Sequence, residues 1–308
     1  REILGYFSAY TPRSPQALDA YAGALKRDGK DTQAKAEIRK FWLAGNMSER
    51  DQAAYLNQYR SHISSHDVYE RASRLVWENK ESAAQAISGE VSGHERAILR
   101  ARLALRGLGG NIEGLLAAVP TSQRDDPGLV HDRVRYRNTH DDEAGAIDLL
   151  LAHPVPANGK IADWWKQREN LALVSLRNGQ IDTAYRLASQ HGFPAATTEP
   201  YMGAEWLSGW IALRFKNDPQ TASRHFKRMY DVAVSVVSRA RGAYWLGRAA
   251  QALGENDKAK GWYQVAAKNG TSFYGQAAAV DLYGQVNIAA PADLHASATE
   301  SAAFEQKD

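Results

Sequence analysis

The chain has 308 residues, of which 44% are hydrophobic, so it is long enough for one large or two ordinary folded domains. Its 38 basic and 35 acidic side chains are interleaved and leave a net charge of +3, too small an excess to indicate nucleic-acid binding. Cysteine is absent, which excludes disulfides, thiolate nucleophiles and cysteine-ligated zinc. No apolar run approaches the roughly 18–20 residues that a membrane span requires, so we expect no transmembrane segment.

Helix start and stop signals recur along almost the whole sequence. An N-cap residue is followed by proline at the first helical position at Ser14, Asp126 and Asp218. Capping-box-like spacing links Ser48 with Asp51 and Ser92 with Glu95. Several glycines fall just past periodic segments and are expected to end helices: Gly29, Gly45, Gly107, Gly179, Gly192, Gly254 and Gly284. We expect about sixteen helices and no strand, which makes the chain all-α.

The clearest pattern lies between residues 239 and 276, where two helices are expected to form a hairpin. In the first, one face carries apolar residues three and four apart: Ala243, Leu246, Ala249, Ala250 and Leu253. Gly254 is expected to cap this helix in the left-handed conformation. The second helix continues the pattern with Ala259, Trp262, Tyr263 and Ala266, and stops at Gly270. Small residues at facing positions are typical of tetratricopeptide-like repeats, in which each helix pair buries its open face against the next.

Copies of this hairpin occur along the chain as a short polar turn followed by a helix that opens with alanine. The anchoring alanines are Ala144, Ala184, Ala222 and Ala259, and their spacings of 40, 38 and 37 residues suit a helix-pair repeat. We therefore predict an α-superhelix, curved or ring-like, over residues 1–284. Its repeats are degenerate over 1–140 and more regular over 141–284. Residues 285–308 are expected to begin a linker towards a C-terminal domain absent from this chain.

Carboxylates offer few catalytic arrangements. Glu300 beside Ser301 is the best candidate for a general acid of glycosidic cleavage, but its polar flanks would not raise a carboxyl pKa as an apolar pocket does. We expect it to begin a surface helix. The pairs at 125–126 and 141–142 are expected to cap helix N-termini.

Histidines offer no convincing metal site. His62 and His66 are four residues apart with Asp67 beside them, but zinc needs a further ligand and the segment is turn-like. We therefore assign no catalytic, cofactor-binding or metal-ligating residue and expect no cofactor.

Aromatic residues could stack on sugar rings, although their spacing also suits a helical core, which we favour. They are Trp164, Trp165, Trp206, Trp210, Trp245, Trp262 and Tyr263. Two series of arginines are expected to form solvated helix faces, with a weak surface for anionic polymers as the alternative. They are Arg96, Arg100, Arg102 and Arg106, and Arg133, Arg135 and Arg137.

The stretch from Ala243 to Ala279, AYWLGRAAQALGENDKAKGWYQVAAKNGTSFYGQAAA, resembles the final superhelical repeat of the soluble lytic murein transglycosylases. Three further stretches resemble successive segments of that family in the same order. They are RDDPGLVHDRVRYRNTHDDEAGAIDLLL from Arg124, DWWKQRENLAL from Asp163 and AEWLSGWIALRF from Ala204. The resemblance covers residues 90–284 well and the earlier part loosely. Its most specific features are the Trp-Leu-Gly-Arg segment at 245–248 and the Thr-Ser-Phe-Tyr-Gly-Gln segment at 271–276.

The resemblance implies a bacterial, periplasmic protein that acts on peptidoglycan. In that family a separate lysozyme-like domain cleaves the glycan strand without water and leaves a 1,6-anhydromuramyl end. The family's catalytic glutamate lies in a Glu-Ser-x-Phe motif followed by Gly-Leu-Met-Gln. Here Glu300-Ser301 is followed by Ala302-Ala303-Phe304, one residue too long, and no Gly-Leu-Met-Gln follows. We therefore transfer no catalytic residue to this chain.

The resemblance leads us to expect the non-catalytic superhelical portion of a lytic transglycosylase, whose catalytic domain lies beyond Asp308. Its partners would be peptidoglycan glycan strands, bound weakly, and its own catalytic domain. The alternative is a helical-repeat adaptor that binds a protein partner without affinity for sugar. A self-contained enzyme is the weakest hypothesis, because no catalytic arrangement stands out in the sequence.

Overall fold

The computed structural model describes residues 2–156 and 160–286, and every regular element in these ranges is helical. The all-α prediction is therefore confirmed. The chain divides after His153 into two compact units, each with its own core. The first unit contains α1 (Glu2–Ala9), α2 (Pro15–Arg27), α3 (Asp31–Ala44), α4 (Glu49–Gln58), α5 (Ser65–Trp77), α6 (Glu81–Ile87), α7 (Gly93–Leu105), α8 (Ile112–Ala117), α9 (Pro127–Thr139) and α10 (Glu143–Ala152). The second unit contains α11 (Ile161–Arg177), α12 (Ile181–Ser189), α13 (Glu199–Arg214), α14 (Pro219–Val232), α15 (Val236–Ala252), α16 (Asn256–Ala267) and α17 (Phe273–Tyr283).

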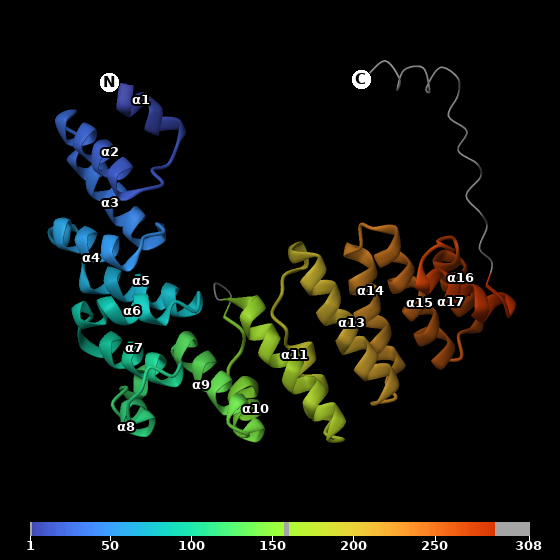
Figure 1. Ribbon diagram of the computed structural model, residues 1–308. Coiled ribbons are helices and arrows are strands. Elements are labelled where there is room, and N and C mark those ends of the chain that lie inside the picture. Colours follow the sequence, from blue (N-terminus) through green and yellow to red (C-terminus); the bar gives the residue numbers. More distant parts are fainter. Residues whose placement is uncertain (1, 157–159, 287–308) are drawn as a thin grey trace, which may run out of the picture. The chain divides into compact units, whose positions relative to one another are not determined.

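Short 3-10 helices lie in the connections: η1 (Arg60–His62), η2 (Ser88–Glu90), η3 (Thr121–Gln123) and η4 (Ala195–Thr197). In the second unit, every helix packs beside the one that follows it in the sequence, as the helix-pair repeat predicts (Figure 1). In the first unit, pairs such as α2 with α3 and α9 with α10 also pack together, but α3 packs on α5, α5 on α7 and α7 on α9. Short connections suffice in both units, because each helix packs on a helix that lies one or two elements away in the sequence.

A common connection links the helices of the repeated pairs. One residue between the two helices has a positive φ, between 51° and 76°: Gly29, Asn79, Asp141, Gly179, Asn217 and Gly254. Five residues later, in the first turn and a half of the second helix, an alanine is no more than 3% exposed: Ala34, Ala84, Ala146, Ala184, Ala222 and Ala259. The left-handed residue reverses the chain, and the small side chain lets the second helix approach the first.

This arrangement corrects one of the predicted anchors. Ala144 is exposed, and Ala146 is the fully buried alanine of α10. Subtracting successive residue numbers from Ala146 to Ala259 then gives spacings of 38, 38 and 37, so the repeat is more regular than the sequence analysis indicated. Asp141 occupies the left-handed position of this connection, with a φ of 58°, although glycine adopts that conformation more readily.

Most of the predicted helix caps are confirmed. The side chains of Ser14, Ser48, Asp126, Asp142 and Asp218 accept hydrogen bonds from backbone N–H groups three residues later, over 2.8–3.2 Å. The cap predicted at Ser92 is wrong, because its side chain makes no capping bond. Its hydroxyl lies 2.8 Å from that of Ser65, so it ties the start of α7 to the start of α5. A capping box that the sequence analysis missed joins Ser64 and Asp67 at α5.

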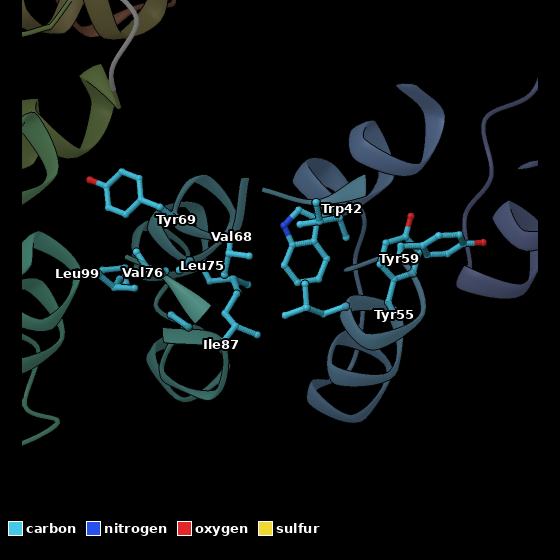
Figure 2. Packing of buried hydrophobic residues seen from close by; sticks show 14 of the residues in the cluster. Trp42, Tyr55, Tyr59, Val68, Tyr69, Leu75, Val76, Ile87 and Leu99 are labelled. Carbon is cyan, nitrogen blue, oxygen red and sulfur yellow. The ribbon is translucent and has the colours of Figure 1, made fainter. Parts of the chain in front are cut away.

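Aromatic side chains fill the core of the first unit between α3, α4 and α5 (Figure 2). Trp42 is fully buried, and its indole N–H donates to the carbonyl of Asp67 over 2.9 Å. Its ring stacks on Tyr55 at 6.0 Å, and the Tyr55 hydroxyl donates to the carbonyl of Ile38 over 2.8 Å. Arg71 places its guanidinium 4.8 Å from the centre of the Trp42 ring. Each polar tip in this core therefore has a partner.

Glycines allow close approach between helices in the second unit. A Cβ atom on Gly247 of α15 would lie 2.5 Å from the ring of Tyr263 on α16, and one on Gly209 of α13 would lie 2.6 Å from Phe226 on α14. The predicted tight hairpin is confirmed in this respect, and Gly254 has the expected left-handed φ of 76°. Leu253 is a correction: it is 38% exposed, because it lies at the C-cap where the helix has already ended.

Candidate functional site

A buried carboxylate, Glu205, lies at the centre of a polar cluster in the second unit. Glu205 belongs to α13 and is 3% exposed. The Nδ1 atom of His225, on α14, lies 2.5 Å from Glu205 Oε2. His191, in the loop after α12, places Nε2 3.4 Å from Glu205 Oε1. The guanidinium of Arg228, also on α14, lies 3.7 Å from the same oxygen. The carboxylate therefore joins two helices and the loop that precedes them.

The contacts of each histidine identify its tautomer. The backbone N–H of Phe193 donates to His191 Nδ1 over 3.0 Å, so the His191 proton lies on Nε2 and points to Glu205. His225 uses Nδ1 towards Glu205, and the Tyr185 hydroxyl lies 3.0 Å from its Nε2. We assign the Tyr185 hydroxyl as the donor in this last contact, so both rings use both nitrogens.

The electrostatics of the cluster keep Glu205 ionised. Burial alone would raise the pKa of Glu205, but hydrogen bonds from His191 and His225 outweigh burial and lower the pKa to about 2. A general acid needs the opposite shift, because it must hold a proton near neutral pH. The arrangement therefore suits a structural role, in which a buried charge joins α13 to α14.

A second buried ion cluster corrects the prediction for the first arginine series. Arg102 of α7 and Arg106, which follows the last residue of α7, each place Nε 2.7 Å from a carboxylate oxygen of Asp132 on α9. The side chains of Arg102 and Asp132 have no exposed surface, and that of Arg106 is 3% exposed. Burial would raise the pKa of Asp132, but the two guanidinium groups and His131 lower it to about 2. The predicted solvated face is thus wrong for Arg102 and Arg106, whereas Arg96 and Arg100 are exposed.

The second arginine series is half-buried, so the expected solvated face is only partly correct. Arg137 donates to the carbonyl of Gly145 over 2.9 Å and lies 3.4 Å from Asp142. It therefore joins α9 to the start of α10. Arg133, one turn earlier on α9, lines a small cavity.

The tryptophans are mainly core residues. Trp164 and Trp165 are 1% and 8% exposed, and Tyr263 is 4% exposed, so core packing is confirmed for these three. Trp206, Trp210, Trp245 and Trp262 are half-buried. Their rings contact other side chains of the second unit rather than forming one open platform.

One aromatic stack joins three helices of the second unit. Trp206 stacks on Trp210 one turn away, with ring centroids 5.8 Å apart, and meets Trp245 of α15 edge to face at 6.1 Å. Trp245 in turn stacks on Phe226 at 5.5 Å. The guanidinium of Arg241 lies 4.2 Å from the centre of Trp206, a cation–π contact that the sequence analysis missed. The four-residue spacing of Trp206 and Trp210 thus produces contacts within the protein, in line with the core packing that we favour for them.

The structure separates the two histidines considered for a metal site. His62 ends η1, whereas His66 is in α5 and places Nδ1 2.5 Å from Glu95. In the ranges 2–156 and 160–286, no group of three histidine or acidic side chains is arranged to hold a metal ion. The candidate Glu300 and its neighbour Ser301 lie outside the described residues.

Comparison with models of known protein families and with curated proteins finds no match to this chain. Among the helices described, none is both long enough and apolar enough to cross a membrane.

Proposed function

We propose that this chain is the non-catalytic helical-repeat region of a bacterial, periplasmic lytic transglycosylase of peptidoglycan. In this role the helix pairs position glycan strands, or the enzyme's own catalytic domain, and cleavage takes place elsewhere in the enzyme. The mild excess of basic side chains gives a surface that would contact an anionic polymer weakly.

The proposal rests on the two most specific features of the family resemblance, at residues 245–248 and 271–276, which lie near each other in the fold. The Trp-Leu-Gly-Arg segment lies in α15, and the Thr-Ser-Phe-Tyr-Gly-Gln segment forms the turn into α17. Residues just before the first segment contact the second: the rings of Tyr244 and Tyr274 lie 5.6 Å apart, and the guanidinium of Arg241 lies 5.9 Å from the centre of the Tyr274 ring. Ser272 caps α17 through the N–H of Gly275 over 3.1 Å. The two segments therefore lie in neighbouring parts of one helical layer, which supports the resemblance better than two isolated motifs would.

Sedimentation with insoluble peptidoglycan tests contact with glycan. The chain should co-sediment at low ionic strength and be released as salt is added, because the expected attraction is electrostatic and weak. A helical protein of similar size and charge serves as the control. Absence of retention at low salt would count against glycan contact.

The reading frame and the mass of the native protein test the parent enzyme separately. We expect a native product about twice the 34.0 kDa of this chain, with an apolar Glu-Ser-x-Phe helix in the following domain. A native protein without such a domain would contradict the assignment to a lytic enzyme.

A protein-binding adaptor is the second candidate, and one surface feature favours it. Val234 lies in the connection between α14 and α15 and is 84% exposed, and Val236 and Val237, the first two residues of α15, are 64% and 57% exposed. Three neighbouring exposed valines are more typical of a protein contact than of a sugar contact. Replacing all three with serine should leave peptidoglycan binding unchanged but abolish binding to a purified protein partner. The reverse result would favour the glycan-positioning role.

A further inference from the structure

A small cavity in the first unit has both cationic and apolar walls. Its volume is about 220 Å³, and its lining residues are Leu116, Ala117, Arg124, Leu129 and Arg133. The two leucines and the alanine come from α8 and α9, and Arg124 comes from the connection between them. The volume lies below the roughly 300–1,000 Å³ of sites for drug-sized ligands, so the cavity suits a small group.

The charge of Arg133 lacks the kind of partner that Arg102, Arg106 and Arg137 have. Arg102 and Arg106 are paired with Asp132, and Arg137 donates to a backbone carbonyl. The guanidinium of Arg133 is half-buried, yet no side chain or carbonyl among the described residues forms a hydrogen bond or ion pair with it. Arg124 donates only its Nε, to the carbonyl of Val119 over 3.2 Å, which leaves its terminal nitrogens available to the cavity.

The surrounding charges oppose the charge on Arg133. Burial lowers the pKa of Arg133, and the positive charges of Arg137 and Arg124 lower it further. The negative charge of Asp125 raises the pKa of Arg133. The Asp125 side chain is 83% exposed, however, and lies 3.1 Å from His153. A half-buried cation that faces two other cations is stabilised by any anion that enters the cavity.

We propose that this cavity binds a small carboxylate. The carboxylate oxygens accept hydrogen bonds from Arg124 and Arg133, whose planar guanidinium groups match carboxylate geometry. The group that carries the carboxylate packs against Leu116, Ala117 and Leu129, which favours a methyl-sized apolar substituent over a fully hydrated anion such as phosphate. This site does not depend on the function proposed above.

Titration of the ¹⁵N-labelled full chain with N-acetylalanine tests the site, with the arginine Nε–Hε signals as readout. N-acetylalaninamide, which lacks the charge, and inorganic phosphate are titrated in parallel. We expect saturable shifts of the Arg124 and Arg133 signals with N-acetylalanine. Arg133→Gln should weaken binding about tenfold or more, as expected when a charge-assisted hydrogen bond is lost. Arg135→Gln removes the same charge from the same helix, does not line the cavity, and should leave binding unchanged.

Thermal unfolding of the free variants separates a binding role from a structural one. Arg133→Gln removes a repelled cation, so the Tm of the free protein should stay equal or rise, whereas an arginine needed for folding would lower it. Arg124→Gln, at an exposed side chain, provides a second test if Arg133→Gln fails to fold. Equal weakening by Arg135→Gln, or no saturable shift with either anion, would overturn the site. Binding of phosphate but not of N-acetylalanine would overturn the assignment to a carboxylate.

Discussion

At the scale of residues, Glu205 shows how a buried charge is accommodated in a helical repeat. An isolated carboxylate at that depth would cost several kcal/mol of desolvation. Two histidine N–H groups and Arg228 offset this cost, and the backbone N–H of Phe193 holds one of the histidines in the required tautomer. Replacing the Glu205 carboxylate with a neutral group therefore leaves the two histidines and Arg228 without their full acceptor, which costs stability.

We expect Glu205→Gln to destabilise the protein by about 3 kcal/mol at pH 7, because a broken buried pair leaves its partners unsatisfied. The matched control is Glu199→Gln, which is exposed in the first turn of the same helix and should change stability by less than about 0.5 kcal/mol. Urea unfolding followed by circular dichroism measures both. Similar losses from the two substitutions would show that the effect is not specific to the cluster.

The same cluster makes a pH-dependent contribution to stability. The folded-state pKa of Glu205 is about 2, below its ordinary value of 4.5, so the unfolded chain binds the proton more readily. The contribution is complete above pH 4.5 and is lost as the pH falls towards 2; at about 1.4 kcal/mol per pH unit it amounts to about 3 kcal/mol. Urea unfolding at pH 7, 4.5 and 3 should therefore show a gap between wild type and Glu205→Gln that narrows only below pH 4.5. A gap that is constant down to pH 3 would contradict this account.

At the scale of elements, the feature that repeats is the connection between paired helices, which contains one residue in the left-handed conformation. Each needs a residue that tolerates a positive φ and, five residues later, a side chain small enough for close helix approach. Glycine meets the first requirement without strain, whereas Asn79, Asp141 and Asn217 meet it at some cost. These two positions therefore recur in every connection, and in some connections a capping side chain such as that of Asp142 or Asp218 is added to them.

Two identical substitutions should have opposite effects on stability. Gly179→Ala, at a φ of 72°, should cost about 1 kcal/mol, because alanine resists the left-handed conformation. Gly203→Ala, in the interior of α13 with open space around a new Cβ, should stabilise by about 0.5–1 kcal/mol through helix propensity. Chemical denaturation of the two variants measures the difference. Effects of the same sign would contradict the proposed role of the connection.

Gly209 and Phe226 should behave as a coupled pair. Phe226→Ala should cost about 3–5 kcal/mol, and Gly209→Leu should also destabilise, because even a Cβ would meet the Phe226 ring at 2.6 Å. Thirty-eight residues earlier, the corresponding positions are the fully buried Leu171 and Ala188, with the large and small residues exchanged. The double variant Gly209→Leu/Phe226→Ala should therefore be more stable than the sum of the single effects by about 1–3 kcal/mol. Additive effects in a double-mutant cycle would contradict this coupling.

Local features of the fold could be predicted from the sequence, and its long-range polar contacts could not. Caps at Ser14, Asp126 and Asp218 depend on neighbouring residues, so the pattern reveals them. The pairing of Arg102 with Asp132 joins positions 30 residues apart, and only packing of α7 against α9 makes it evident. The same applies to His191 and His225: nothing in the sequence connects them, and they meet only because both contact the carboxylate of Glu205.

At the scale of the whole molecule, the chain consists of two units that each have a core and a buried ion cluster. Asp132 with its two arginines lies in the first unit, and Glu205 with its two histidines lies in the second. In a helical repeat, stability is close to a sum of individual repeats and nearest-neighbour contacts. Damage to one cluster should therefore stay mainly within its own unit.

We expect the two units to unfold in separate steps that respond to different substitutions. Asp132→Asn breaks the buried pairs with Arg102 and Arg106 and should lower the stability of the first unit by about 3–5 kcal/mol, with little effect on the second. Glu205→Gln should do the reverse. Hydrogen exchange of amides in α7 and α9 and of amides in α13 and α14 reports on the two units within the same intact chain. If either substitution accelerates exchange equally in both sets of helices, the two units unfold in a single step. That result would contradict the prediction that each core is stabilised separately.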